Sequence, residues 1–215
     1  MTIAPSPDQA ALLDTTDAEI RLGRQLRFLM EADRLKSVLR ASKLSDGSRR
    51  ENTGEHSWHI ALFAMTLADQ AGPDVSIDRV IKMLLLHDLV EIDTGDVPIH
   101  SANGQAHASA EQQGAEARAA DRIFGLLPAD QGAEFRALWD EFEAAESPDA
   151  RFAKAVDRVQ PLLLNLANDG GSWIEYSVTR AQVESRIGTK VTPGAPRLWA
   201  YISRRIDAWF AGRAG

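Results

Sequence analysis

KMLLLHDLVEIDTGD, residues 82–96, joins a run of leucines to a dense group of acids around one histidine. The leucines suit the buried stripe of a helix, and His87 and Asp88 follow them directly. An ionised aspartate at the inner end of such a stripe costs on the order of several kcal/mol unless it is paired or metal-bound. Glu91 is the i+4 partner of His87 and shares its face. The stretch predicts a buried metal site, with a helix-end network of salt bridges as the alternative.

A second histidine is expected to point into the core in ENTGEHSWHI, residues 51–60. Asn52 with Glu55 three positions later is the pattern of a capping box, which predicts that a helix begins here. The helical repeat aligns His56 with an apolar stripe of Ile60, Phe63 and Leu67. A lone inward histidine is usually structural. The downstream His-Asp pair makes His56 a candidate metal ligand instead.

A further acid lies in ARFAKAVDRVQPLLLNLAND, residues 150–169. Asp157 sits at the border of an apolar stripe, and Pro161 leaves the carbonyl of residue 157 without its helical donor. The resulting kink could aim Asp157 at a pocket. An ordinary ion pair with Lys154 or Arg158 is the equal alternative.

Composition excludes several classes of protein. The chain has 215 residues, 44% of them apolar, which fits one globular domain over residues 16–212 behind a flexible leader at 1–15. It has no cysteine, so any metal must be held by His, Asp and Glu. A net charge of −7 argues against binding long nucleic acid. The sequence shows no secretory leader and no apolar run long enough for a membrane span, so we expect a cytoplasmic protein.

The periodicity predicts helices and almost no strand. The first helix begins at Thr16, which forms a capping box with Glu19. Residues 93–105, with their glycine and proline breakers, are expected to form a loop. Further helices are expected over 53–70, 76–92, 109–127, 131–145, 148–168 and 179–187, with a last one through 198–209. These elements predict an all-α, single-domain bundle.

The motifs together resemble the HD-domain metal-dependent phosphohydrolase superfamily. In its 5'-deoxynucleotidase branch the two main segments read approximately E-N-x-x-E-H-S and H-D-x-x-E-x-x-x-G-D-x-P, as residues 51–57 and 87–98 do here. LKSVLR, residues 35–40, resembles the LKxxxR segment of that branch, and residues 138–165 resemble its C-terminal half. The resemblance covers roughly residues 20–190.

The resemblance implies an HD-domain helical bundle with a metal site between helices. It implies that four side chains bind one divalent ion, namely His56, His87, Asp88 and Asp157. Imidazole with carboxylate and without sulfur suits Mn, Co, Fe, Zn or Ni, and Mg less naturally. The resemblance makes Glu91 and Asp96 the catalytic acids and places Arg40 on the substrate phosphate. It also implies a homodimer.

The activity implied is release of phosphate from (deoxy)ribonucleoside 5'-monophosphates by a metal-activated water. Glu91 would orient or deprotonate that water, while Asp96 would protonate the leaving oxygen or hold the water. The alternatives are another small phosphorylated substrate, such as a sugar phosphate, a nucleoside triphosphate or an alarmone, or a non-catalytic regulator that binds metal or nucleotide. The presence of both acids favours an enzyme.

Several nearby residues are less decisive. The bacterial nucleotidases have a tryptophan after the arginine of LKxxxR, where this chain has Ala41, so the preference for base and sugar stays open. Arg49 and Arg50 either assist the phosphate or are solvated loop charges. His59 is expected to pack against the site or support it. His100 and His107 fall in or beside the expected loop.

Overall fold

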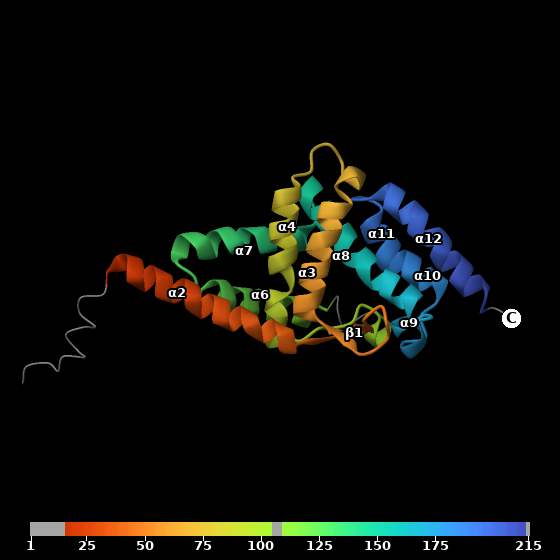
Figure 1. Cartoon of the computed structure of the whole chain (residues 1–215), viewed down its shortest axis with the longest axis horizontal. Helices are drawn as coiled ribbons and strands as arrows, with labels where there is room; N and C mark the ends of the chain where they lie inside the picture. Colours follow the sequence, from red (N-terminus) through yellow and green to blue (C-terminus); the bar gives the residue numbers. More distant parts are fainter. Residues whose placement is uncertain (1–15, 105–108, 214–215) are drawn as a thin grey trace, which may run out of the picture.

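The computed structural model describes residues 16–104 and 109–213, which are predominantly helical (Figure 1). The all-α class expected from the sequence is confirmed. The predicted leader at 1–15 and His107 lie outside the described residues. Among the helices that the structure describes, none is both long and apolar enough to cross a bilayer.

The α-helices follow the predicted order. They are α2 (Asp17–Ala32), α3 (Thr53–Thr66), α4 (Ile77–Leu86), α5 (Glu91–Thr94), α6 (Ala110–Phe124), α7 (Ala129–Ala144), α8 (Pro148–Ala167), α9 (Ser172–Glu175), α10 (Arg180–Val183), α11 (Thr189–Val191) and α12 (Pro196–Ala211). Short 3-10 turns lie at Asp33–Ser37, Ala68–Gln70, His87–Val90 and Ser101–Gly104. The helix expected over 179–187 consists instead of α10, a π-helical turn at Glu184–Gly188 and α11.

Both predicted capping boxes are present. The Asn52 side chain accepts from the backbone N–H of Glu55 at 2.9 Å, and the Glu55 carboxylate accepts from the backbone N–H of Asn52 at 3.0 Å. Thr16 and Glu19 form the same reciprocal pair at the start of α2. With α3 begun at this point, His56 falls in its first turn and is completely buried, as the helical repeat predicts.

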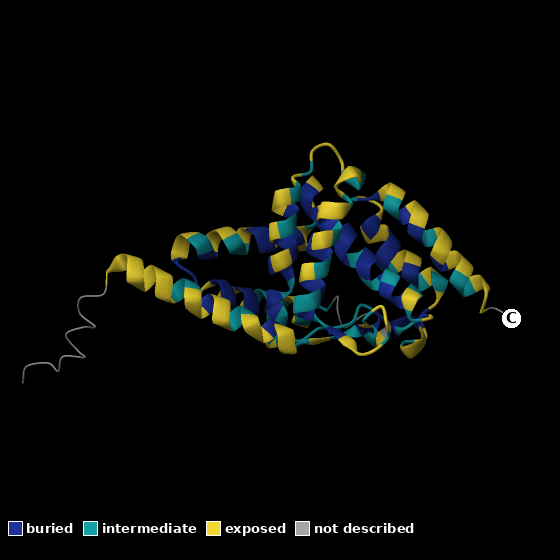
Figure 2. Ribbon diagram, viewed as in Figure 1, coloured by how far each residue is buried: buried dark blue, intermediate teal, exposed yellow. Residues whose placement is uncertain are grey.

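α8 lies at the centre of the bundle, where it packs against α3, α4, α7 and α11 (Figure 1). Many of its apolar side chains are fully buried, among them Phe152, Val156 and Val159. Figure 2 shows the buried residues gathered along α8 and the inward sides of α3 and α4, whereas α2 is largely exposed. A polar residue on the inward face of α8, such as Asp157 or Gln160, is therefore placed in the interior of the protein.

A small hairpin that the sequence analysis did not predict precedes α3. β1 (Leu39–Lys43) pairs antiparallel with β2 (Arg50–Asn52), with an irregular register between Leu39 and Lys43. Its loop turns at Asp46-Gly47, where Gly47 has a φ of 72° and Asp46 accepts a hydrogen bond from the Ser48 backbone. An Asp-Gly pair favours such a turn because glycine adopts positive φ without strain. The hairpin therefore carries Arg40 toward the bundle interior.

The helix predicted over 76–92 is interrupted. α4 ends at Leu86, and a 3-10 turn from His87 to Val90 separates it from the short helix α5. α5 ends at Thr94 and is capped by Gly95, which has a φ of 71°. The His-Asp pair thus lies on a tight turn at the inner end of α4 rather than within a continuous helix.

Replacing Asn52 by alanine removes the side-chain acceptor of the α3 cap and should lower the free energy of unfolding by about 1 kcal/mol. Urea titration followed by circular dichroism would measure the loss. Asn52→Ser, which keeps a capping oxygen, should remain within a few tenths of a kcal/mol of the parent. Equal losses in the two variants would contradict a capping role.

Candidate metal centre

Two imidazoles and a carboxylate meet where the start of α3 faces the turn after α4. His56, His87 and Asp88 each offer a ligand atom, and these atoms all lie within 4.8 Å of one another. Asp157 approaches from α8, with Oδ1 3.1 Å from His56 Nε2 and 3.8 Å from His87 Nε2. The structure therefore brings together the four residues that the motifs single out.

Asp157 also has the cationic neighbour that its local sequence offered as an alternative. Arg158 Nε lies 3.5 Å from Asp157 Oδ2, whereas Lys154 donates to Glu143 at 2.9 Å. The Asp157 carboxylate thus places one oxygen beside the histidines and the other beside Arg158. The ion pair and the inward placement occur together.

The ring of His87 is oriented by its own turn. Nδ1 lies 2.9 Å from the carbonyl oxygen of Leu84, a bond that requires the proton on Nδ1. Nε2 is buried and has no hydrogen-bond partner, although Asp88 Oδ1 lies 2.9 Å away in an unfavourable direction. Buried polar atoms are normally satisfied, so an unpartnered imidazole nitrogen facing carboxylates fits a bound cation.

The carboxylates around His87 also favour a bound cation. Burial alone would lower the pKa of His87, but the Asp88 and Asp157 carboxylates outweigh burial and raise the pKa to about 10. Burial would raise the pKa of Asp88, yet His87 and Arg40 lower it well below its ordinary value. The cluster therefore attracts positive charge strongly. A divalent ion would take the place that a proton on His87 otherwise fills.

The donor set fits a divalent metal in its chemistry as well. Two imidazole nitrogens and two carboxylates, without sulfur, suit Mn, Co, Fe, Zn or Ni better than a purely oxygen-preferring ion such as Mg. The residues present thus fit the metal that the sequence analysis expects.

Arg40 closes the cluster on the side of the hairpin. Its Nη1 lies 3.0 Å from Asp88, 3.5 Å from Asp96 and 3.8 Å from Glu91. These three carboxylates raise the pKa of the buried guanidinium far above its ordinary value, against the effect of burial. Arg40 is therefore a fixed positive charge inside the protein.

Glu91 and Asp96 line a cavity together with Arg40, His87, Asp88 and Asp157. Glu91 accepts a hydrogen bond from the Thr53 hydroxyl at 2.9 Å. Burial, with Asp88 as the next cause, raises the pKa of Glu91 well above its ordinary value. Burial likewise raises the pKa of Asp96, although Arg40 opposes it. Both carboxyl groups are thereby shifted toward the range useful for proton transfer at neutral pH.

The HD-domain family matches residues 32–199, more than half of the chain. The chain belongs to the HD-domain family. A crystal structure described as a predicted metal-dependent phosphohydrolase, from Magnetospirillum magnetotacticum MS-1, is 49% identical to it. The two superpose with a TM-score of 0.81 over 88% of this chain and 95% of the other.

Two curated relatives carry the name 5'-deoxynucleotidase. Human 5'-deoxynucleotidase HDDC2 is 30% identical over 139 residues, which are 64% of this chain and 65% of the human protein. A 5'-deoxynucleotidase from Photorhabdus laumondii is 30% identical over 167 residues, or 76% of this chain and 84% of the relative. The HD-domain chain thus spans 65% of the human relative's length and more of the bacterial one.

The HD-domain cavity extends beyond the metal cluster. Its wall includes Ala41 and Ser42, which follow Arg40 in β1, and Tyr176. Asn165 and Ser172 also line it and are hydrogen-bonded to each other. His100 lines it as well, and its Nδ1 lies 3.2 Å from Arg186 Nη1. The space can therefore hold more than a phosphate.

Arg49 and Arg50 are not brought to this cavity. Arg49 forms a bidentate pair with Glu55, at 2.6 and 2.8 Å, and Arg50 pairs with Glu175 at 2.9 Å. Neither arginine lines the cavity, and both side chains are more than 40% exposed. Arg49 and Arg50 therefore resemble solvated surface charges more than residues that assist the phosphate.

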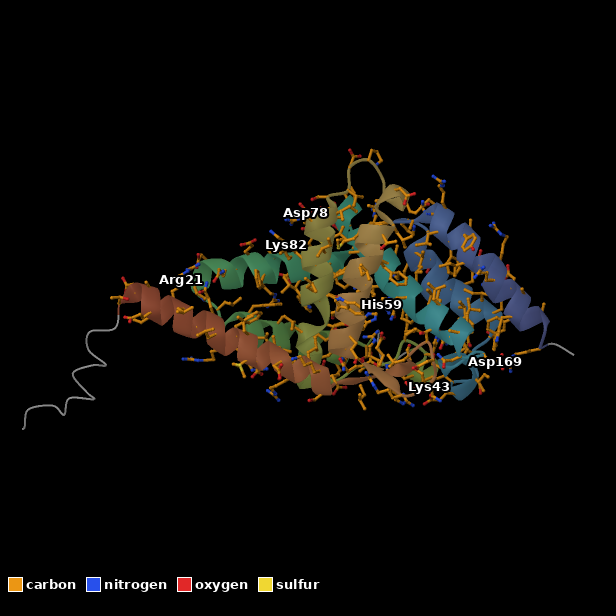
Figure 3. All side chains as sticks on the ribbon, viewed as in Figure 1. Arg21, Lys43, His59, Asp78, Lys82 and Asp169 are labelled. Atoms are coloured by element: carbon orange, nitrogen blue, oxygen red, sulfur yellow. The ribbon has the colours of Figure 1, made fainter. Side chains whose placement is uncertain are left out.

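Glu51 and Gln160 are buried against His56 and were not among the site residues expected from the sequence. Glu51 stands within the E-N-x-x-E-H-S segment, and Gln160 is three residues after Asp157, so it shares its helix face. That spacing was the available signal for Gln160. His59 also reaches this group, with Nδ1 3.2 Å from Gln160 Nε2, where α3 faces α8 (Figure 3).

A divalent ion should raise the melting temperature of metal-stripped protein, because it relieves repulsion among buried carboxylates. When the concentration of free Mn²⁺ is one hundred times the Kd, the free energy of unfolding is expected to rise by about 2.7 kcal/mol. Differential scanning fluorimetry would measure it. NaCl at equal ionic strength is the control, and the gain should vanish in His87→Ala. A shift equal to that in NaCl would argue against the centre.

Proposed function

We propose that this HD-domain protein is a divalent-metal-dependent phosphohydrolase that releases phosphate from (deoxy)ribonucleoside 5'-monophosphates. The observation that carries the proposal is the junction of a buried His-Asp cluster, a fixed guanidinium and two carboxyl groups of raised pKa in one cavity. The relatives named as phosphohydrolase and 5'-deoxynucleotidases support the reaction class and the substrate class.

His56, His87, Asp88 and Asp157 are the proposed ligands of one ion, with Mn, Co, Fe, Zn, Ni and Mg as the candidates. When bound, the ion supplies charge neutralisation on the phosphoryl group and a lowered pKa for an attacking water. The unpartnered Nε2 of His87 and the carboxylates beside it support this assignment.

Arg40 is the proposed anchor of the substrate phosphate. It is positively charged, largely shielded from solvent and held by Asp88, so its guanidinium can donate hydrogen bonds to phosphate oxygens from a fixed place. Stabilising the charge on the phosphoryl group in this way usually provides the largest share of catalysis.

Glu91 and Asp96 are proposed to carry the two proton transfers. A water oxygen forms the new bond to phosphorus while the bond from phosphorus to the 5'-oxygen breaks. One proton leaves the water, and one is delivered to the 5'-oxygen of the departing nucleoside. Two carboxyl groups beside Arg40 and with raised pKa values are suited to these exchanges. The nucleoside would lie against the part of the wall that contains Ser42 and Tyr176.

Replacing Glu91 by glutamine should lower kcat at least tenfold, because a positioned acid or base contributes roughly a hundredfold or more. Metal content, measured by elemental analysis, should stay at the parent level. Asp93→Asn is the matched control, since Asp93 lies on the same short helix but pairs with Arg122. Full turnover in Glu91→Gln would remove Glu91 from the mechanism.

A screen of phosphate release tests the proposed substrate class. The purified protein would be assayed against nucleoside monophosphates, sugar phosphates, nucleoside triphosphates and alarmones with each candidate ion. We expect release from the deoxyribonucleoside 5'-monophosphates. Preferential release from a sugar phosphate or another metabolite would reassign the substrate, and tight nucleotide binding without turnover would favour a regulator.

A homodimer and a cytoplasmic location remain predictions from the sequence. Light scattering on the purified chain measures the first directly. Exposed apolar side chains that a partner could cover are present on α3, namely Trp58, Leu62 and Met65.

A further inference from the structure

Gln160 is a fully buried amide that touches three polar side chains at once. Its Nε2 lies 2.7 Å from Glu51 Oε1 and 3.2 Å from His59 Nδ1, while its Oε1 lies 3.1 Å from His56 Nδ1. Gln160 is 0% exposed and Glu51 is 2% exposed. These contacts join β2, α3 and α8 behind His56, on the side of the ring away from Asp157.

The partners determine which way the amide faces. A carboxylate oxygen can only accept, so the NH₂ group of Gln160 must face Glu51. The carbonyl oxygen of Gln160 then faces His56, and the ring nitrogen opposite it must be a donor. Turning the amide over would put its carbonyl oxygen 2.7 Å from the Glu51 carboxylate, which is repulsive. Glu51 therefore sets the orientation of Gln160, and Gln160 requires a proton on His56 Nδ1.

His56 would otherwise have a competing arrangement. A proton on Nε2 could be donated to Asp157 Oδ1, which is 3.1 Å away, and a metal could not then bind that nitrogen. With the proton on Nδ1, the lone pair of Nε2 points toward Asp157 and Asp88. The Glu51 carboxylate adds to the preference, because its Oε2 lies 3.6 Å from His56 Nδ1.

The two histidines differ in what orients them. His87 Nδ1 donates to the carbonyl oxygen of Leu84 in the adjoining turn of its own chain segment. Within the described part of the chain, His56 has no such backbone partner and depends on side chains from β2 and α8, more than a hundred residues apart in sequence. The metal-binding form of His56 is thus set by tertiary contacts.

We propose that Glu51 and Gln160 are a positioning pair that keeps His56 in the tautomer with a free Nε2 and thereby sets the metal affinity of the centre. This inference rests on the proposed role of His56 as a ligand. Neither Glu51 nor Gln160 touches the metal, and each acts through His56. Residues that orient a metal-binding histidine commonly change metal affinity by about tenfold to a hundredfold when they are replaced.

Gln160→Met keeps the length of the side chain and removes both hydrogen-bonding groups. Titration of metal-stripped protein with Mn²⁺ in a calorimeter should give a Kd raised about tenfold to a hundredfold. Asn168→Ala is the matched control, because Asn168 is also an amide at the end of α8 and its side chain donates to the carbonyls of Leu44 and Leu164, away from His56. It should lower stability without changing the Kd.

The double substitution Glu51→Gln with Gln160→Glu tests the pair without removing its hydrogen-bonding groups. One carboxylate and one amide remain, and the carboxylate now accepts directly from His56 Nδ1. We expect a Kd within about threefold of the parent, or lower. Imidazole ¹⁵N shifts should show the Nδ1–H form of His56 in the parent and in the double variant, and a loss of that form in Gln160→Met.

The outcomes separate the inference from the proposed function. An unchanged Mn²⁺ Kd in Gln160→Met, with a raised Kd in His56→Ala, overturns the positioning role alone. An unchanged Kd in His56→Ala, or no Mn²⁺ binding by the parent, overturns the proposed ligand set. If Gln160→Met fails to fold, the Mn²⁺ Kd of the double variant Glu51→Gln, Gln160→Glu tests the inference instead. A Kd raised more than tenfold in that variant would also overturn it.

Discussion

Buried negative charge is the constraint on which the rest of this structure depends. Five shielded carboxyl groups lie around Arg40 and His56: Glu51, Asp88, Glu91, Asp96 and Asp157. Arg40 lies among them and Arg158 lies beside Asp157, while burial raises the pKa of Glu91 and Asp96. Burying ions costs several kcal/mol each unless charge and hydrogen bonds compensate. The hairpin, α3, the turn after α4 and α8 must therefore all converge on one place.

Apolar packing holds these elements in position. α8 is buried along most of its length and packs against α3, α4 and α7 at once. The His87 ring packs against Phe142 with centroids 4.6 Å apart, and the Trp139 indole donates to the His87 carbonyl oxygen at 3.0 Å. The turn that bears the His-Asp pair is thus fixed on two sides. A site built on such supports needs little rearrangement to bind a cation.

The hydrogen bonds around the metal centre differ in how far apart in sequence their partners lie. Those at His87 are made partly within its own turn, so they form wherever the turn forms. Those at His56 and Arg40 join β1, β2, the turn after α4 and α8. The centre is consequently assembled only when the whole bundle has packed, which couples the metal site to the stability of the fold.

The sequence by itself determined the helices, both capping boxes, the inward position of His56 and the grouping of the His-Asp motif with Glu91. These follow from local rules, because helical periodicity and capping act within a few residues. The tertiary structure decided the break after Leu86, the hairpin that presents Arg40, the outward pairing of Arg49 and Arg50, and the place of Gln160 behind His56. Each charged or polar side chain has several possible partners along the chain, and only packing brings one of them within hydrogen-bonding distance.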